Sequence, residues 1–251
     1  MNASAPAILI DTSANVRLRD VTLMNVSDSV ASTVPAIIVR NSAGVSIERV
    51  SLRRSGGLRI EASQNSRVRY LSGFEIVGGV FLDVTGSDTT VLEDLWLENE
   101  TATHTLDAGI RVRNSPRTQM TRAVSDGGPT VDGSGFEIEL GAQDDRESRF
   151  VDLIARRQPN RGCALLGLGL SVSETACVDS VCGNAEFGPG LNSVAWSILP
   201  GSGDVRVLNS RRENDCLDRI VSGEARARTF AVVARQEPLR ARRFSEWCVE
   251  S

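Results

Sequence analysis

The sequence predicts an all-β solenoid of about eight coils stacked along one axis. Its main signal is a phrase of two apolar pairs set five residues apart, first seen as Val16-x-Leu18 followed by Val21-x-Leu23. The phrase occurs eight times in all, at intervals of 21 to 30 residues. A unit this short cannot bury its own apolar residues, so it must pack against the units before and after it.

The later copies of the phrase are looser, but they keep the period. They lie at Val45/Ile47/Val50/Leu52, Leu71/Phe74/Ile76, Leu92/Leu95/Leu97, Met120/Ala123, Phe150/Leu153/Ala155, Cys177/Ser180/Cys182 and Val205/Val207. A second apolar run precedes the phrase, as in Ile37-x-Val39 and Val80-x-Leu82. Alternation at period two, rich in β-branched residues, predicts strands. Asn41 and Asn114 suit tight corners, because asparagine tolerates the left-handed conformation.

The repeated stretches, such as residues 36 to 47, resemble the right-handed parallel β-helix superfamily. This superfamily includes pectate lyases, polygalacturonases and many phage tailspikes, and the resemblance covers roughly residues 5 to 215. It implies a single-stranded right-handed parallel β-helix over residues 1–224. Residues 225–251 depart from the repeat and are expected to form a C-terminal capping segment.

The composition excludes several classes of chemistry. All 28 basic residues are Arg, so no Lys is present for a Schiff base or a phosphate-binding loop. A net charge of −4 argues against nucleic-acid binding, and no apolar run is long enough to span a membrane. Because the first residues show no signal peptide, the expected location is a virion, or the extracellular space after cytoplasmic assembly. Cys177 and Cys182 are expected to be small buried hydrophobes, and no metal site is expected among the five Cys.

Side chains between the inward pairs should face outward, and two outward rows follow from this alternation. One row reads Leu9, Ile38, Arg59, Phe81, Arg111 and Glu137, and the other Thr22, Ser51, Glu75, Trp96, Val124, Ile154, Val181 and Arg211. The apolar members predict a ligand or partner surface made of Leu9, Ile38, Phe81, Trp96, Val124, Ile154 and Val181. Three readings stay open: cover by the chain's own turns, side-by-side packing of a homo-oligomer, or a saccharide platform on Trp96 and Phe81.

Long turns at residues 98–107, 126–132 and 156–161 are the expected place for chemistry. The candidate catalytic residues are Glu98, Asp126, Asp132 and Arg157. Paired carboxylates suit acid/base work on a glycosidic bond, or they could bind Ca²⁺ through oxygen. No other cofactor is expected.

Motifs of the characterised enzymes of this fold are largely missing. Of the polygalacturonase-like motifs only an Asp-Asp pair occurs, at Asp144 and Asp145. The stretch from Arg157 to Arg161 is one residue short of the pectate lyase element, and Tyr70 lacks the surroundings of an epimerase tyrosine.

Two functions therefore follow from the sequence. The first is a structural or receptor-facing protein, an oligomeric virion component such as a tailspike, fibre or head decoration that contacts glycans. The alternative is a carbohydrate-active enzyme, a polysaccharide lyase or glycoside hydrolase with a non-standard active site on the long turns. The expected partners are further copies or other structural subunits, and polysaccharide.

Overall fold

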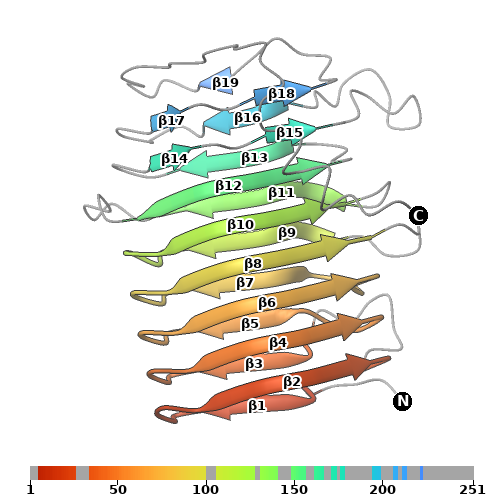
Figure 1. Cartoon of the computed structure of the whole chain (residues 1–251), viewed down its shortest axis with the longest axis vertical. Coiled ribbons are helices and arrows are strands. Elements are labelled where there is room, and N and C mark those ends of the chain that lie inside the picture. Colours follow the sequence, from red (N-terminus) through yellow and green to blue (C-terminus); the bar gives the residue numbers. More distant parts are fainter. Residues whose placement is uncertain are drawn as a thin grey trace.

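The chain folds as a parallel β-helix, as expected, and two parallel sheets form its walls (Figure 1). The computed structural model describes residues 5–26, 34–99, 106–127, 131–140, 148–156, 161–166, 171–173, 176–178, 194–198, 206–208, 211–213 and 221–222. It describes side chains for residues 5–26, 34–99, 108–127, 134–140 and 148–155. The expected capping segment 225–251 lies outside the described residues.

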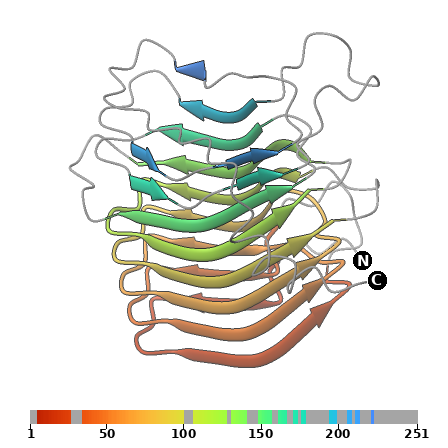
Figure 2. The same ribbon diagram turned by 45° about the horizontal axis from the view of Figure 1, so that its top comes forward.

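The first sheet contains nine parallel strands in the described residues, one more than the eight coils expected. They are β1 (Ile8–Asp11), β3 (Ile37–Arg40), β5 (Leu58–Glu61), β7 (Val80–Thr85), β9 (Leu106–Arg113), β11 (Val131–Glu139), β13 (Arg161–Leu166), β16 (Val194–Ile198) and β19 (Val221–Ser222). From β1 to β13 each strand pairs with the strand two places on in the chain, and β16 and β19 follow at steps of three, so every coil adds one strand to this wall (Figure 2).

The second sheet holds the strands that alternate with these. They are β2 (Arg17–Met24), β4 (Ser46–Arg53), β6 (Arg67–Phe74), β8 (Val91–Glu98), β10 (Gln119–Asp126), β12 (Arg149–Arg156), β14 (Ser171–Ser173), β15 (Ala176–Val178), β17 (Arg206–Leu208) and β18 (Arg211–Glu213). β14 and β15 both pair with β12, so in that coil two short strands stand where earlier coils have one long strand.

A bend in each long strand explains the repeated apolar phrase. In β2 the backbone turns at Asp20, whose φ is 55°, and the same column holds Arg49, Tyr70, Asp94, Arg122 and Asp152, all with positive φ. One apolar pair lies before the bend and the other after it. In the second coil Val45, Ile47, Val50 and Leu52 are all at most 2% exposed, which confirms that both pairs point inward.

The corner between the two sheets is held by serine side chains. The backbone N–H of Ser13 donates to Ser42 Oγ at 3.1 Å, and that of Ser42 donates to Ser63 Oγ at 3.2 Å. Ser63, Ser87 and Ser115 continue the ladder in the same way. The residue before each Ser turns the chain, and Asn41 and Asn114 have φ of 50° and 46°, as their sequence predicted. Buried N–H groups at this corner therefore find partners in the next coil.

The third coil departs from the predicted register. Its inward residues in β6 are Val68, Leu71 and Gly73, in line with Ile47, Val50 and Leu52 of β4. Phe74 was expected inside, but it follows Gly73 and lies in an outward column. Glu75 was expected in the outward row of Ser51 and Trp96, but Ser72 occupies that position.

Phe81 explains this difference. It was expected on the outer surface, but it is 0% exposed and lies in the core. A Cβ added at Gly73 would meet the Phe81 ring carbons at 2.5 and 2.6 Å. The ring fills the space that an inward side chain at Gly73 would need. Asp83 takes the outward position between Arg59 and Arg111.

Cys177 is also displaced, because the sequence predicted it at the inward position that Ile47 holds in the second coil and Cys182 at that of Leu52. It pairs with Ala155, in the column of Leu52 rather than that of Ile47. Cys182 and Ser180 lie outside the described residues.

Candidate functional site

The outer face of the second sheet brings predicted residues together near the ends of β6, β8 and β10. We name the group of Phe74, Trp96, Glu98, Val124 and Asp126 the Trp96 strip. In the strand register Phe74 is followed by Glu98 and then by Asp126, and Trp96 is followed by Val124. Neighbouring strands lie about 4.8 Å apart, so the Glu98 and Asp126 backbones are adjacent. Residues that the sequence assigned separately to catalysis and to a surface thus share one strip.

Trp96 and Glu98 are joined directly. The indole Nε1–H of Trp96 donates to Glu98 Oε2 at 3.2 Å. Both side chains are partly exposed, and their hydrogen bond fixes the indole beside the carboxylate. The strip therefore presents an aromatic surface and an adjacent acceptor in one orientation.

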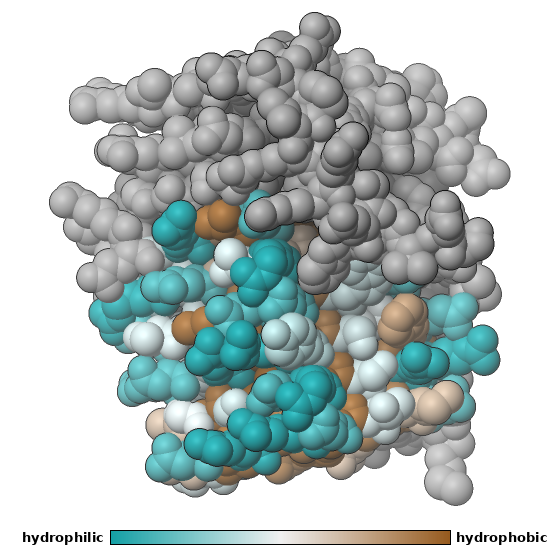
Figure 3. All heavy atoms as spheres, viewed as in Figure 1, coloured by the Kyte–Doolittle hydropathy of each residue, from teal (hydrophilic) through white to brown (hydrophobic). Residues whose placement is uncertain are grey.

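Phe74 extends the aromatic part of the strip. The Arg53 guanidinium lies over its ring, with 5.1 Å between Cζ and the ring centroid. Phe74 stands between Arg53 and Glu98 in the register, so the positive group does not adjoin the carboxylate. Hydrophilic side chains dominate the described part of this face, and hydrophobic atoms form narrow bands between them (Figure 3).

Val124 and Ile154 face outward in register with Trp96, as expected. They are nevertheless only 8% and 4% exposed, so other atoms of the chain cover them. Among the described apolar residues of this row, Trp96 is therefore the one that is partly exposed.

The other predicted site residues do not join this strip. Leu9 is 50% exposed and lies beside the partly exposed Ile38 on the outer face of the first sheet. Asp132 belongs to β11 of the first sheet, where only its backbone is described. Arg157 and Val181 lie outside the described residues.

A second charged surface lies on the first sheet and was not identified from the sequence. We name Arg59, Asp83, Arg111, Arg113 and Glu137 the Arg59 ladder. Arg59 Nε lies 3.3 Å from Asp83 Oδ2, and Arg111 Nε lies 3.0 Å from Glu137 Oε2. Arg113 also forms an ion pair with Glu137. The sequence could have indicated this surface, because oppositely charged residues recur there at the period of one coil. The outward row predicted for this sheet held Phe81 in the place of Asp83, so the alternation of charge was missed.

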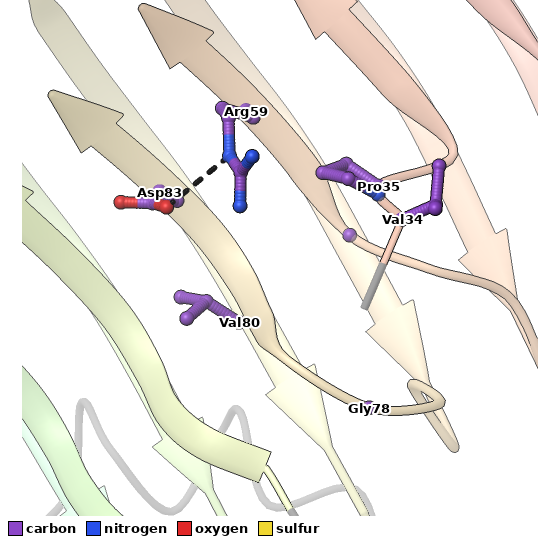
Figure 4. Close-up of a pocket in the computed structure, with 7 residues that line it drawn as sticks. Val34, Pro35, Arg59, Gly78, Val80 and Asp83 are labelled. Carbon is purple, nitrogen blue, oxygen red and sulfur yellow. Dashed lines mark ion pairs between the residues drawn. The ribbon is translucent and has the colours of Figure 1, made fainter. Parts of the chain in front are cut away.

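A small hollow adjoins this ladder. Val34, Pro35, Gly57, Arg59, Gly78, Val80 and Asp83 line it, and the Arg59–Asp83 ion pair forms one side (Figure 4). The backbones are close here, since a Cβ at Gly57 would meet the Val80 carbonyl oxygen at 2.1 Å. The two charged side chains that line this hollow are already paired with each other.

The electrostatics of the Arg59 ladder centre on Glu137. Burial alone raises the pKa of Glu137, but hydrogen bonds and charges from Arg113 and Arg111 outweigh it, and the pKa lies below its ordinary value of 4.5. The carboxylate is therefore stabilised as an anion by two arginines of its own chain.

The described residues lack two further features. No group of three or more His, Cys, Asp or Glu side chains lies together there as a metal-ligand set. Nor does the described part contain a helix with the length and apolar character needed to cross a membrane.

Comparisons with known proteins show little similarity to this chain. No family model matches the chain, and no curated protein matches it. Among solved structures it is similar to an alginate lyase from Paenibacillus sp. str. FPU-7, with 8% identity, 89% of this chain and 94% of that chain covered, and a TM-score of 0.45. The description of this chain as a parallel β-helix rests on its own strand pairing.

Proposed function

We propose that this chain is a structural, receptor-facing β-helix protein that binds a saccharide on the Trp96 strip without cleaving it. The observation that carries the proposal is the Trp96 indole held against Glu98, with Asp126 on the next strand. An indole face packs against the apolar C–H face of a sugar ring, and carboxylate oxygens accept hydrogen bonds from its hydroxyl groups.

The scaffold supports this role. The strip lies on strands that pair on both sides over most of their length, so its side chains project from a rigid wall. Binding therefore needs little ordering of the protein, which lowers the entropic cost of association.

The test uses two exposed aromatic residues of the same chain. We expect Trp96→Ala to weaken binding of a polysaccharide, measured by affinity gel electrophoresis, by at least about tenfold. Tyr70, 47% exposed at the bend of β6, is the matched control, and Tyr70→Ala should leave binding unchanged. Loss of binding in Tyr70→Ala with full binding in Trp96→Ala would place the site elsewhere and reject the strip.

The oligomeric virion component predicted from the sequence is the setting that we propose for this role. Solenoids of this kind offer two long walls along which copies can pack. Light scattering at several concentrations tests the setting, and a mass equal to that of one chain throughout would reject it.

A second candidate function is supported by one specific feature, the adjacency of two carboxylates. Retaining glycosidases hold their two carboxyl groups about 5–5.5 Å apart, close to the spacing of neighbouring strands. Glu98 and Asp126 would then act on a glycosidic bond. Release of reducing ends by the wild-type chain, abolished in Glu98→Gln and in Asp126→Asn, would favour this enzyme over the binding protein.

A further inference from the structure

The charges around Trp96 restrict the class of saccharide. This inference rests on the proposed function of the Trp96 strip. Most described carboxylates on these coils pair with an arginine of a neighbouring coil, such as Glu75 with Arg54 at 2.7 Å and Glu93 with Arg67 at 2.9 Å. Glu98 differs, because its described side-chain contact is the neutral indole N–H of Trp96.

No described residue forms an ion pair with Glu98. The next residue in its column is Asp126, a second carboxylate, and the residue before it is the uncharged Phe74. The side chain in contact with the aromatic platform thus keeps its negative charge facing outward.

From this arrangement we infer that the strip binds an uncharged saccharide and discriminates against polyuronates. A sugar stacked on Trp96 would bring its substituents close to Glu98. Hydroxyl groups there donate to the carboxylate, whereas a uronate carboxylate can only repel it. Like charges a few ångströms apart near a surface weaken binding on the order of tenfold.

Arg53 does not reverse this preference. Its guanidinium lies over the Phe74 ring, on the far side of Phe74 from Glu98 in the register. A uronate that reached Arg53 would lie beyond the contact between Trp96 and Glu98. The residue that determines specificity is therefore Glu98, next to the aromatic platform.

The experiment compares two polymers in affinity gels, a neutral glucan and polygalacturonate. The wild-type chain should be retarded by the glucan and about tenfold less by polygalacturonate. Glu98→Gln keeps the shape of the side chain and removes its charge, so it should raise affinity for polygalacturonate about tenfold. Glu61→Gln removes the same charge from an exposed residue of β5 on the other sheet, and it should change neither affinity.

The possible outcomes distinguish a failure of this inference from a failure of the proposed saccharide binding. Tighter binding of polygalacturonate by the wild-type chain, lost in Trp96→Ala, would overturn the inference and keep the saccharide-binding strip. An equal gain in Glu61→Gln and Glu98→Gln would also overturn it, because net charge rather than position would then decide. No retardation by either polymer, or retardation unchanged in Trp96→Ala, would reject the proposed function itself.

Discussion

The two outer faces of this β-helix use the same strand spacing in opposite ways. On the first sheet, Glu137 accepts from Arg111 and Arg113, so the charges of the Arg59 ladder are compensated within the chain. On the second sheet, Glu98 contacts only the indole of Trp96 among described side chains. No described cation compensates its charge, which can therefore interact with solvent or a ligand. A column of residues one strand apart can therefore join coils or contact a ligand, depending on whether the neighbouring coil supplies the opposite charge.

The comparison also shows where stability and function can be separated. A carboxylate held by two arginines contributes to stability, and the loss of Glu137 takes this partner from Arg111 and leaves Arg113 with Glu139. A carboxylate that contacts one neutral donor contributes little to stability. Substitutions on the two faces should thus affect different measurements.

The largest expected effect comes from the core that supports both faces. Phe81→Ala removes a fully buried ring that packs against Gly73, and it should lower the free energy of unfolding by about 3–5 kcal/mol. Urea unfolding measures this loss. Phe81→Leu is the milder control, and in that background Gly73→Ala should be tolerated better than in the wild type, because the ring carbons at 2.5 Å are gone. A loss below 1 kcal/mol in Phe81→Ala would contradict the packing described here.

The next effect contrasts the two faces directly. Glu137→Gln should cost about 1–3 kcal/mol, since it removes charged hydrogen bonds to Arg111 and Arg113. Glu98→Gln should change stability by no more than about 0.5 kcal/mol, because it touches no described ion pair. Chemical denaturation of both variants gives the comparison. Equal losses in the two variants would show that the faces do not differ in this way.

A dependence on pH should distinguish the same two residues. The pKa of Glu137 is depressed in the folded chain, so its contribution is complete above the ordinary value of 4.5 and is lost as the pH falls through the folded value. The difference in unfolding free energy between wild type and Glu137→Gln should therefore shrink below about pH 4.5. Urea unfolding at pH 7, 5 and 3.5 measures this, and a difference constant over that range would contradict the role of the ionised carboxylate.

The fold could be predicted from the sequence because a parallel β-helix requires apolar residues that alternate along each strand and recur once in every coil. Apolar pairs such as Val45 and Ile47 recur at coil spacing, and Asn41 and Asn114 mark the corners that they in fact occupy. The third coil could not be read in this way. Gly73 at an inward position has no side chain to follow, and Phe81 enters the core from the opposite sheet, a contact that neighbours in sequence do not reveal.

The candidate site was predicted in pieces. Trp96 came from the outward row, whereas Glu98 and Asp126 came from the beginnings of long turns. Glu98 and Asp126 are instead the last residues of β8 and β10, which places Glu98 beside the tryptophan and Asp126 next to Glu98 on the neighbouring strand. Their convergence depends on exact strand register, which period alone leaves uncertain by two or three residues. For the same reason Asp83, two positions from the expected Phe81, escaped the row of charges on the other sheet.

The smallest effect concerns two ion pairs of identical geometry at the bend of the long strands. Arg49 holds Asp20, and Arg122 holds Asp94, each through Nε at 2.5 Å and Nη2 at 2.9 Å. The Asp20 side chain is 62% exposed and that of Asp94 is 8% exposed.

Burial should decide which of these two pairs matters. Asp94→Asn replaces the nearly buried carboxylate that Arg122 contacts with a neutral amide. It should therefore lower the free energy of unfolding by about 1 kcal/mol, visible as a lower thermal midpoint. Asp20→Asn should leave the midpoint unchanged, since water and salt already screen that pair. If both variants lost the same stability, the geometry of the pair would outweigh its burial. The contrast between the two faces would then have to be explained by the number of partners that each carboxylate has rather than by its exposure to solvent.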